Sequence, residues 1–192
     1  MHATLHGNAP PLEIRSAMDA DSPAVHAVAL AAFGKAQGPE IVDLIDSLSK
    51  DASAMPVLSF VATCQARVVG HILFSSVRLT GAREQVAASI LAPLCVHPDF
   101  QQQGIGGSLI RFGLSRLQAM GVGLVFVLGH PGYYPRHGFV PAGERGLAAP
   151  YPIPPEHADA WMVQALRPDL LGTVTGTVAC AQTLTDPRHW QE

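Results

Sequence analysis

The chain has 192 residues, of which 48% are hydrophobic and 14% charged, and its formal net charge is −3 at pH 7. This composition can bury a sizeable core, so we expect a single domain over residues 1–192 with little disorder. Because the charge balance is slightly acidic and Lys and Arg form no run, the sequence argues against nucleic acid or an anionic membrane as a partner.

Three cysteines, Cys64, Cys95 and Cys180, are odd in number and far apart, which fits neither a disulfide framework nor a zinc module. We therefore expect buried thiols in a reducing compartment. The first residues, MHATLHGNAPP, lack the basic region and apolar core of a secretion signal. No run reaches the roughly 18 apolar residues of a membrane span. The sequence predicts a cytoplasmic protein.

The first quarter of the chain predicts one strand and two helices. Residues 12–16 have the composition of a strand, and the helix that follows carries Pro23 in its first turn and ends at Gly34. Apolar residues then recur at helical spacing over residues 41–48, behind Pro39. We expect this second helix to follow the first closely.

The middle of the chain predicts a meander followed by a β-α-β unit. Residues 56–63, 67–79 and 86–96 are rich in aliphatic and β-branched side chains and are separated by short polar turns, which is typical of antiparallel strands. Helical periodicity over residues 105–120 and the apolar run LVFVL at residues 124–128 complete the unit.

The last third of the chain is crowded with glycine and proline and predicts mainly loops. A final strand is expected over residues 160–166. We place the core at about residues 12–166 and treat residues 167–192 as a C-terminal extension. Within it, residues 172–184 alternate weakly and are expected to add an edge strand at most.

A glycine-rich loop stands where the third strand of the meander passes into the next helix, in the stretch HPDFQQQGIGGSLIRFG. A helix start leaves several N–H groups unpaired, and glycine lets an anion approach them closely, so the loop predicts a phosphate cradle without a basic residue of its own. A dinucleotide fingerprint would need glycine at Leu109, and a Walker loop would need Gly-Lys-Ser or Gly-Lys-Thr. A structural role alone, in a tight turn, is the other interpretation.

Two spaced motifs resemble those of the GNAT acetyltransferases. QQQGIG, residues 101–106, resembles the family's Gln/Arg-x-x-Gly-x-Gly/Ala motif, and YYPRHGF, residues 133–139, resembles its Tyr-x-x-x-Gly-Phe segment. The stretches VVGHILFS, APLCVHPDFQQQGIG and VFVLGHPGYYPRHGF are similar to the bacterial YhbS-like subgroup of N-acetyltransferases. Together with the order of elements, the resemblance covers roughly residues 12–142.

The resemblance implies an α+β fold with α/β/α layers, in which a mixed central sheet splays between its fourth and fifth strands and is flanked by helices. It also implies acetyl-CoA as a co-substrate in that cleft, with its pyrophosphate on the glycine loop and its pantetheine arm along the fourth strand. The cofactor-binding residues that match the family pattern are Leu94, Cys95, Val96, Gln102, Gln103, Gly104, Ile105, Gly106, Gly107 and Ser108.

The activity implied is acetyl transfer by direct attack of an amine on the thioester, through a tetrahedral intermediate that expels a thiolate. Tyr134 matches the position that donates a proton to the thiolate in many relatives. A backbone N–H at Cys95 or a neighbour is expected to stabilise the oxyanion. Many relatives carry asparagine seven residues before the tyrosine, and this chain has Val127 there, which puts the detailed geometry around the sulfur in doubt.

The sequence assigns no general base. Relatives often place a carboxylate on the fourth strand, which here reads ASILAPL and has no acid. Glu40, His71, His97 and His130 are candidates, while an amine that arrives partly deprotonated would need no base. His130 and His137 bracket the tyrosines at a spacing that matches no metal motif, so we expect no metal.

Three functions stay open. The leading one is an N-acetyltransferase acting on a primary amine of an unidentified small molecule or protein, with Phe33, Glu40 and the segment at residues 150–156 at the mouth of its acceptor site. The alternative is a non-catalytic sensor or assembly module that binds CoA or acyl-CoA, which the missing carboxylate favours and the tyrosine disfavours. An enzyme that uses a longer acyl chain is the third. A homodimer also stays open.

Overall fold

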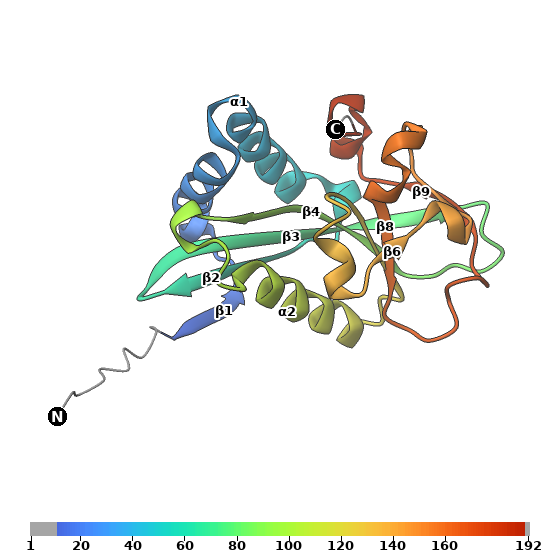
Figure 1. Cartoon of the computed structure of the whole chain (residues 1–192), viewed down its shortest axis with the longest axis horizontal. Helices are drawn as coiled ribbons and strands as arrows, with labels where there is room; N and C mark the ends of the chain where they lie inside the picture. The colour runs from blue at the N-terminus through green and yellow to red at the C-terminus, as the bar shows by residue number, and fades with distance from the viewer. Residues whose placement is uncertain (1–10, 191–192) are drawn as a thin grey trace.

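A central mixed sheet with helices on both faces forms the body of the computed structural model, which describes residues 11–190 (Figure 1). Residues 1–10, where we expected no targeting signal, and residues 191–192 lie outside the described residues. The strands are β1 (Leu12–Ser16), β2 (Leu58–Cys64), β3 (Arg67–Thr80), β4 (Ala88–Val96), β5 (Leu124–Leu128), β6 (Val140–Pro141), β7 (Leu147–Ala148), β8 (Trp161–Ala165) and β9 (Gly176–Ala179), and the α-helices are α1 (Ser22–Lys50) and α2 (Ile105–Ala119).

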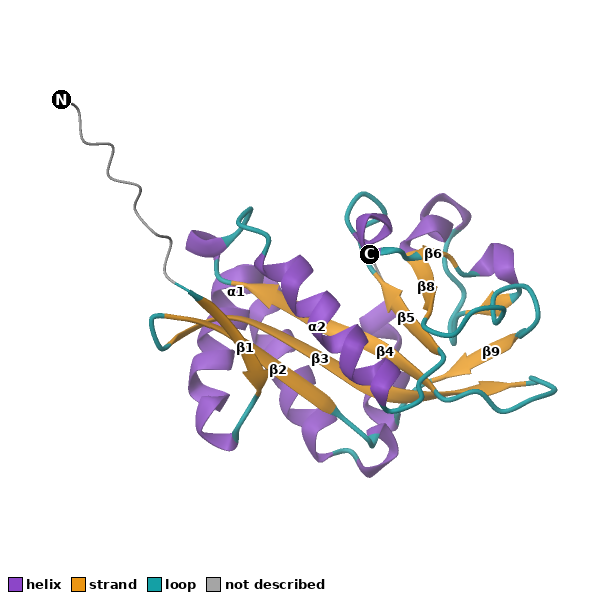
Figure 2. Ribbon diagram, turned by 90° about the horizontal axis from the view of Figure 1, so that it is seen from below, coloured by secondary structure: helices purple, strands orange, loops and turns teal. Residues whose placement is uncertain are grey.

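The sheet has the order β1-β2-β3-β4-β5-β8-β6, with β9 pairing one end of β3 and β7 beside it. β2 to β4 are antiparallel neighbours, as predicted for the meander, and β1 adds to β2 in the same sense. β4 and β5 are parallel across α2. Side chains of β5 alternate between the two faces, with Leu124 and Phe126 in the core under α1 and Val125 and Val127 in the core under α2. The α/β/α layering is therefore confirmed (Figure 2).

The predicted splay between β4 and β5 is also confirmed. The two strands pair over three residues only, the last pair being Ile90 with Phe126, and then run on without pairing each other. Beyond that point Ala92 and Pro93 stand opposite the single residue Leu73 of β3, which is a β-bulge. Pro93 has no N–H to offer a neighbouring strand, so this stretch of β4 is suited to lining an open space.

The two helices predicted near the N-terminus form one element, α1, that bends at Gly34. Gly34 has φ 70° and interrupts the helical backbone, which is where the first helix was expected to end. The second half begins directly after the bend rather than behind Pro39, so its start was predicted too late. A Cβ on Gly38 would lie 3.0 Å from the Cα of Leu30, so the glycine allows the two halves to approach closely.

The C-terminal tail is part of the core rather than an addition to it. β9 pairs antiparallel with the end of β3 and parallel with β7, so it lies between two strands. Beyond it, two short 3-10 helices place Leu184 and Trp190 in the core cluster under α1. The Trp190 indole Nε1 donates a hydrogen bond to the Leu184 carbonyl at 2.8 Å. The weak alternation of residues 172–184 predicted the strand β9, but it did not predict that the chain would then return toward α1.

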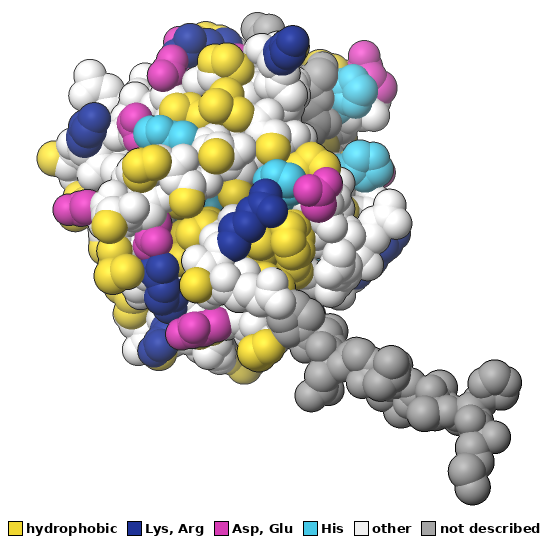
Figure 3. Space-filling view, turned by 90° about the vertical axis from the view of Figure 1, so that its left-hand side faces the viewer, with side chains coloured by type: hydrophobic (Ala, Val, Ile, Leu, Met, Phe, Trp, Pro, Cys, Tyr) yellow, Lys and Arg dark blue, Asp and Glu magenta, His cyan; other side chains and the backbone are white. Residues whose placement is uncertain are grey.

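The outer surface is mixed in character. On the face shown in Figure 3, acidic and basic side chains are dispersed among apolar ones, and neither sign gathers into a large patch. Over residues 11–190, neither helix combines the length and the apolar character needed to cross a membrane.

Gly113 gives a test of the packing between α2 and the sheet. A Cβ at this position would collide with the ring of Phe74, which is fully buried on β3. We expect Gly113→Ala to lower the free energy of unfolding by about 1–3 kcal/mol, despite the better helix propensity of alanine, because the core has no room for the methyl group. Urea unfolding measures this change.

Two further variants make this test specific. A methyl group on Gly143 would meet only open space, so Gly143→Ala should leave stability nearly unchanged. The double variant Gly113→Ala with Phe74→Leu should recover part of the loss that Gly113→Ala causes. A Gly113→Ala protein as stable as the parent would contradict this packing.

Candidate functional site

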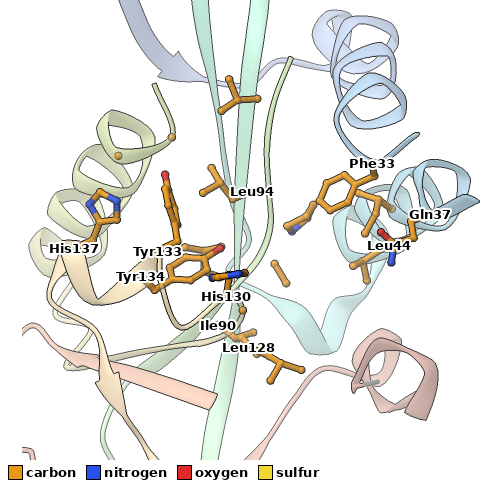
Figure 4. A pocket seen from close by; sticks show the side chains of 18 of the residues that line it. Phe33, Gln37, Leu44, Ile90, Leu94, Leu128, His130, Tyr133, Tyr134 and His137 are labelled. Carbon is orange, nitrogen blue, oxygen red and sulfur yellow. The ribbon is translucent and has the colours of Figure 1, made fainter. Parts of the chain in front are cut away.

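A cavity of about 950 Å³ lies in the wedge between β4 and β5. Its walls come from the end of β4, the glycine loop and the start of α2, the segment after β5, the second half of α1 and the C-terminal tail. Figure 4 shows Phe33, Gln37 and Leu44 on one side and Tyr133 and His137 across from them. The volume is that of a small-molecule or cofactor site.

The glycine loop presents a row of unpaired main-chain donors. The N–H groups of residues 102–107 donate no hydrogen bond to any described residue, and the first helical bond of α2 runs from the Ser108 N–H to the Gly104 carbonyl at 3.0 Å. Gln102 and Gly104 have φ 61° and 80°. Such a sequence of backbone conformations turns successive N–H groups toward one side, and the helix dipole adds positive potential there. The geometry of the loop is therefore suited to binding an anion.

Basic side chains surround this helix start, although the loop itself has none. A Cβ on Gly107 would lie 2.7 Å from His137 Cε1 and 3.3 Å from Arg111 Nη1, so both side chains lie over the glycine. Arg136 also lines this part of the cavity. Burial lowers the pKa of His137, and Arg111 and Arg136 lower it further, so the imidazole is neutral at pH 7.

Tyr134 lies in the wall of the cavity, between the two parting strands. Its side chain is 9% exposed and packs edge-on against Phe139, with ring centroids 5.6 Å apart. Gly129 leaves room for the Tyr134 ring, because a Cβ at that position would collide with it. The Tyr134 hydroxyl makes no hydrogen bond to any residue of the described chain, and burial, with a smaller effect of Tyr133, raises the pKa of the phenol. The phenol therefore stays protonated at neutral pH.

The neighbouring Tyr133 points in a different direction. Its hydroxyl lies over Gly106, where any Cβ would collide with it, and its ring is 5.1 Å from that of His137. Tyr133 therefore covers the first turn of α2, and a larger residue at Gly106 would displace it.

The main chain of β4 alternates between β3 and the wedge. The His97 N–H donates to the Val69 carbonyl of β3 at 2.9 Å. Because the polar groups of successive strand residues point to opposite edges, those of Cys95 also face β3, while those of Leu94 and Val96 face the wedge. The stretch beyond Ile90, unpaired with β5, thus offers donors and acceptors from alternate residues only.

Seven of the ten expected cofactor-binding residues line the cavity, and these are Leu94, Val96, Gln102, Gly104, Ile105, Gly106 and Gly107. Cys95, Gln103 and Ser108 do not line it. The Gln103 side chain donates to the Asp99 carbonyl at 3.2 Å, and the Ser108 hydroxyl accepts from Arg111 at 3.0 Å. The Cys95 thiol packs on the α1 side of the sheet, and burial raises its pKa to about 12.

The four candidate bases separate into two pairs. Glu40 and His130 line the cavity, whereas His71 and His97 do not. His71 is 1% exposed inside the sheet, so it has no access to a substrate in the cavity. Among residues 11–190, no three His, Cys, Asp or Glu side chains lie together in a way that could hold a metal ion.

The far end of the cavity is built partly from residues that no sequence motif singled out. Leu184, Arg188, His189 and Trp190 reach it from the C-terminal tail, opposite Phe33 and Glu40 of α1. The segment at residues 150–156, expected at the mouth, does not line the cavity; instead, its Tyr151 packs behind Trp190 with ring centroids 5.9 Å apart. Only the α1 part of that expectation agrees with the structure.

Comparisons with known proteins all identify the same family. Residues 57–141 match the family described as an acetyltransferase (GNAT) domain. The protein YjhQ of Escherichia coli K12, named as an uncharacterized N-acetyltransferase, is 50% identical over 140 residues, which are 72% of this chain and 77% of YjhQ.

Two crystal structures are also similar. The GNAT family N-acetyltransferase YhbS of Escherichia coli, in complex with CoA, has a TM-score of 0.81 and 29% identity, over 95% of this chain and 96% of that one. A GNAT family acetyltransferase of Brucella melitensis, in complex with acetyl-CoA, has a TM-score of 0.70 and 30% identity, over 91% and 98% of the two chains.

His71 makes stability depend on pH. Its Nε2 is 2.8 Å from the Ser59 hydroxyl, its Nδ1 has no partner among the described residues, and burial, aided slightly by His26, lowers its pKa from 6.5 to about 4. Between these two values the unfolded chain binds a proton that the folded chain does not. The free energy of unfolding should therefore fall as pH falls, by up to about 1.4 kcal/mol per pH unit.

We expect His71→Gln to remove this part of the pH dependence. Denaturant unfolding at several pH values between 6.5 and 4 measures it in both proteins. The control His157→Gln changes an exposed histidine and should keep the parent slope. Equal slopes in the parent and His71→Gln proteins would show that His71 is not held neutral.

Proposed function

Since the chain belongs to the GNAT family of N-acetyltransferases, we propose that it transfers the acetyl group of acetyl-CoA to a primary amine by direct attack. The row of unpaired N–H groups at residues 102–107, facing the wedge between β4 and β5, is the observation that carries this proposal. The enzyme is an acyl-CoA-dependent N-acyltransferase, and acetyl-CoA is its co-substrate.

The residues of the cavity fit this co-substrate at both of its polar parts. The amides of residues 102–107 suit a diphosphate, and Arg111 and Arg136 supply charge beside it. The wedge-facing N–H and C=O groups of Leu94 and Val96 suit the amides of a pantetheine arm, which would run along β4 like an added strand. Gln101 already occupies one of these acceptors, because its side chain donates to the Val96 carbonyl at 3.0 Å.

The reaction forms one bond and breaks one. The amine nitrogen bonds to the acetyl carbon, and the bond from that carbon to sulfur then breaks. The nitrogen gives up a proton and the sulfur takes one, so no other reactant is needed. Negative charge on the carbonyl oxygen is stabilised by a wedge-facing N–H, for which Leu94 and Val96 are better placed than Cys95.

In this proposal Tyr134 stabilises the leaving thiolate. Its hydroxyl lies in the cavity wall without a partner among the described residues, and burial keeps it protonated. Because its pKa lies above the usual range of a thiol, the phenol acts first as a hydrogen-bond donor, and the proton that the amine releases keeps it neutral. A hydrogen bond to a charged group contributes about 1.5–3 kcal/mol, which sets the size of the expected effect.

The route of the proton from the amine does not require a base on β4. Only Glu40 and His130, among the four candidates, line the cavity, and water reaches both. The intact cradle and the buried tyrosine favour turnover over a sensor that only binds CoA.

Gly106→Val tests the cradle. Its side chain would displace Tyr133 and cover the amides of the first turn, so the dissociation constant for CoA should rise about 10- to 100-fold. Isothermal titration calorimetry measures the affinity, and circular dichroism checks that the protein is folded. Gly143→Val, on an open surface, should bind CoA like the parent. Unchanged affinity in a folded Gly106→Val protein would remove the cradle from the proposal.

Tyr134→Phe tests the donor to sulfur. We expect kcat to fall about 10- to 100-fold, with little change in CoA affinity, because the hydrogen bond forms only as the thiolate leaves. Release of free thiol from acetyl-CoA, measured against a panel of amines, gives the rate. Release at the parent rate would exclude Tyr134 from the chemistry and leave the enzyme class standing. Binding of CoA with no release for any amine would favour the sensor.

A further inference from the structure

The cavity has two ends of different chemistry. Arg111, Arg136 and the free amides make the α2 end suitable for anions. The other end, between α1 and the C-terminal tail, is mainly apolar and is lined by Phe33, Ile41, Leu44, Leu128, Leu184 and Trp190. We call this end the acceptor half-site. It adjoins the parting strands, so a ligand bound there has access to the acetyl group.

Glu40 is the one carboxylate among the described residues that line the cavity. It makes no hydrogen bond to any of them, and its nearest charged neighbours are His189 Nδ1 at 3.4 Å and Arg188 Nε at 3.7 Å. Arg188 is closer to Asp186, at 3.1 Å. Burial and Arg188 lower the pKa of His189, which leaves that imidazole neutral at pH 7. Glu40 therefore has a negative charge that the protein compensates only in part.

The tail that completes the half-site is fixed in place at its start. The Asp51 carboxylate, at the end of α1, accepts from the Thr183 N–H and hydroxyl, both at 2.8 Å. The Ser53 hydroxyl accepts from the Gln182 N–H, also at 2.8 Å. Trp190 then packs edge-on against Trp161, with ring centroids 5.8 Å apart. The half-site is thus held together by contacts within the chain, which lowers the entropic cost of binding.

We propose that the acceptor is a primary amine carried on an apolar, unbranched or aromatic group, whose ammonium faces Glu40 while the apolar group lies between α1 and the tail. This inference rests on the proposed function. A second ammonium on the acceptor would meet Arg188 and the apolar wall instead of a second carboxylate, which is costly. A carboxylate beside the amine would be repelled by Glu40, and Arg188 already pairs with Asp186. Before attack, the ammonium loses its proton to water.

The half-site is tested by binding, so that the result does not depend on turnover of any one amine. The protein is first saturated with CoA, and 2-phenylethylamine, ethanolamine, spermidine and phenylalanine are then titrated into it by calorimetry. We expect 2-phenylethylamine to bind at least about tenfold more tightly than the other three. Glu40→Gln should weaken its binding about tenfold and leave CoA affinity unchanged. Asp43→Asn, an acid on the same helix outside the cavity, is the matched control and should bind like the parent.

The outcomes separate this inference from the proposed function. Three results would overturn the inference that the acceptor is an apolar amine and would leave the proposed transferase activity in place. These are failure of 2-phenylethylamine to bind, equally tight binding of ethanolamine, spermidine or phenylalanine, and an affinity for 2-phenylethylamine that Glu40→Gln does not change. Failure of CoA itself to bind would overturn both. If Asp43→Asn weakened the binding of 2-phenylethylamine as much as Glu40→Gln does, the effect would come from the overall charge of the protein. That result would also contradict a direct contact between the ammonium and Glu40.

Discussion

The N–H groups of residues 102–107, which find no partner among residues 11–190, are the constraint around which the site is arranged. Residues 102–104 are exposed and residues 105–107 are buried, so water satisfies part of the row, and an anion at the helix start would satisfy several of these donors at once. The parting of β4 and β5 gives that anion room, and Gly106 and Gly107 let Tyr133 and His137 approach the helix start. The free N–H groups, the parted strands and the two glycines therefore form a binding site only in combination.

Charge along the cavity is ordered from one end to the other. Arg111 and Arg136 lie at the α2 end, whereas the end formed by α1 and the tail holds Glu40 together with Arg188, which is closer to Asp186 than to Glu40. In the proposed function, a molecule with phosphates and a molecule with an ammonium bind at opposite ends, and their reactive groups meet between the strands. The net charge of the whole chain is too small to show this arrangement.

Much of the fold could be predicted because its signals are local: the alternation of the meander, the periodicity of α2 and the glycines at residues 104–107. The missing parts depend on contacts between distant residues. Arg111 and Arg136 meet at the cradle only after folding, and Asp51 holds Thr183 across 132 positions of the chain. The direction of the Cys95 main chain follows from strand register, which composition does not reveal. Gly34 was correctly predicted as a helix end, yet the restart directly after it depended on the close packing of Gly38 on Leu30.

The position of Cys95 also bears on the kinetic order of the reaction. Its thiol lies on the strand that would hold a thioester, but it is buried in the core on the α1 side of the sheet, does not line the cavity and donates to the His71 carbonyl. With a pKa of about 12 it holds almost no thiolate at neutral pH. Acylation of Cys95 as a covalent intermediate is therefore disfavoured, which agrees with the proposed direct attack of the amine on a bound thioester, and alkylating reagents should find Cys95 a poor target.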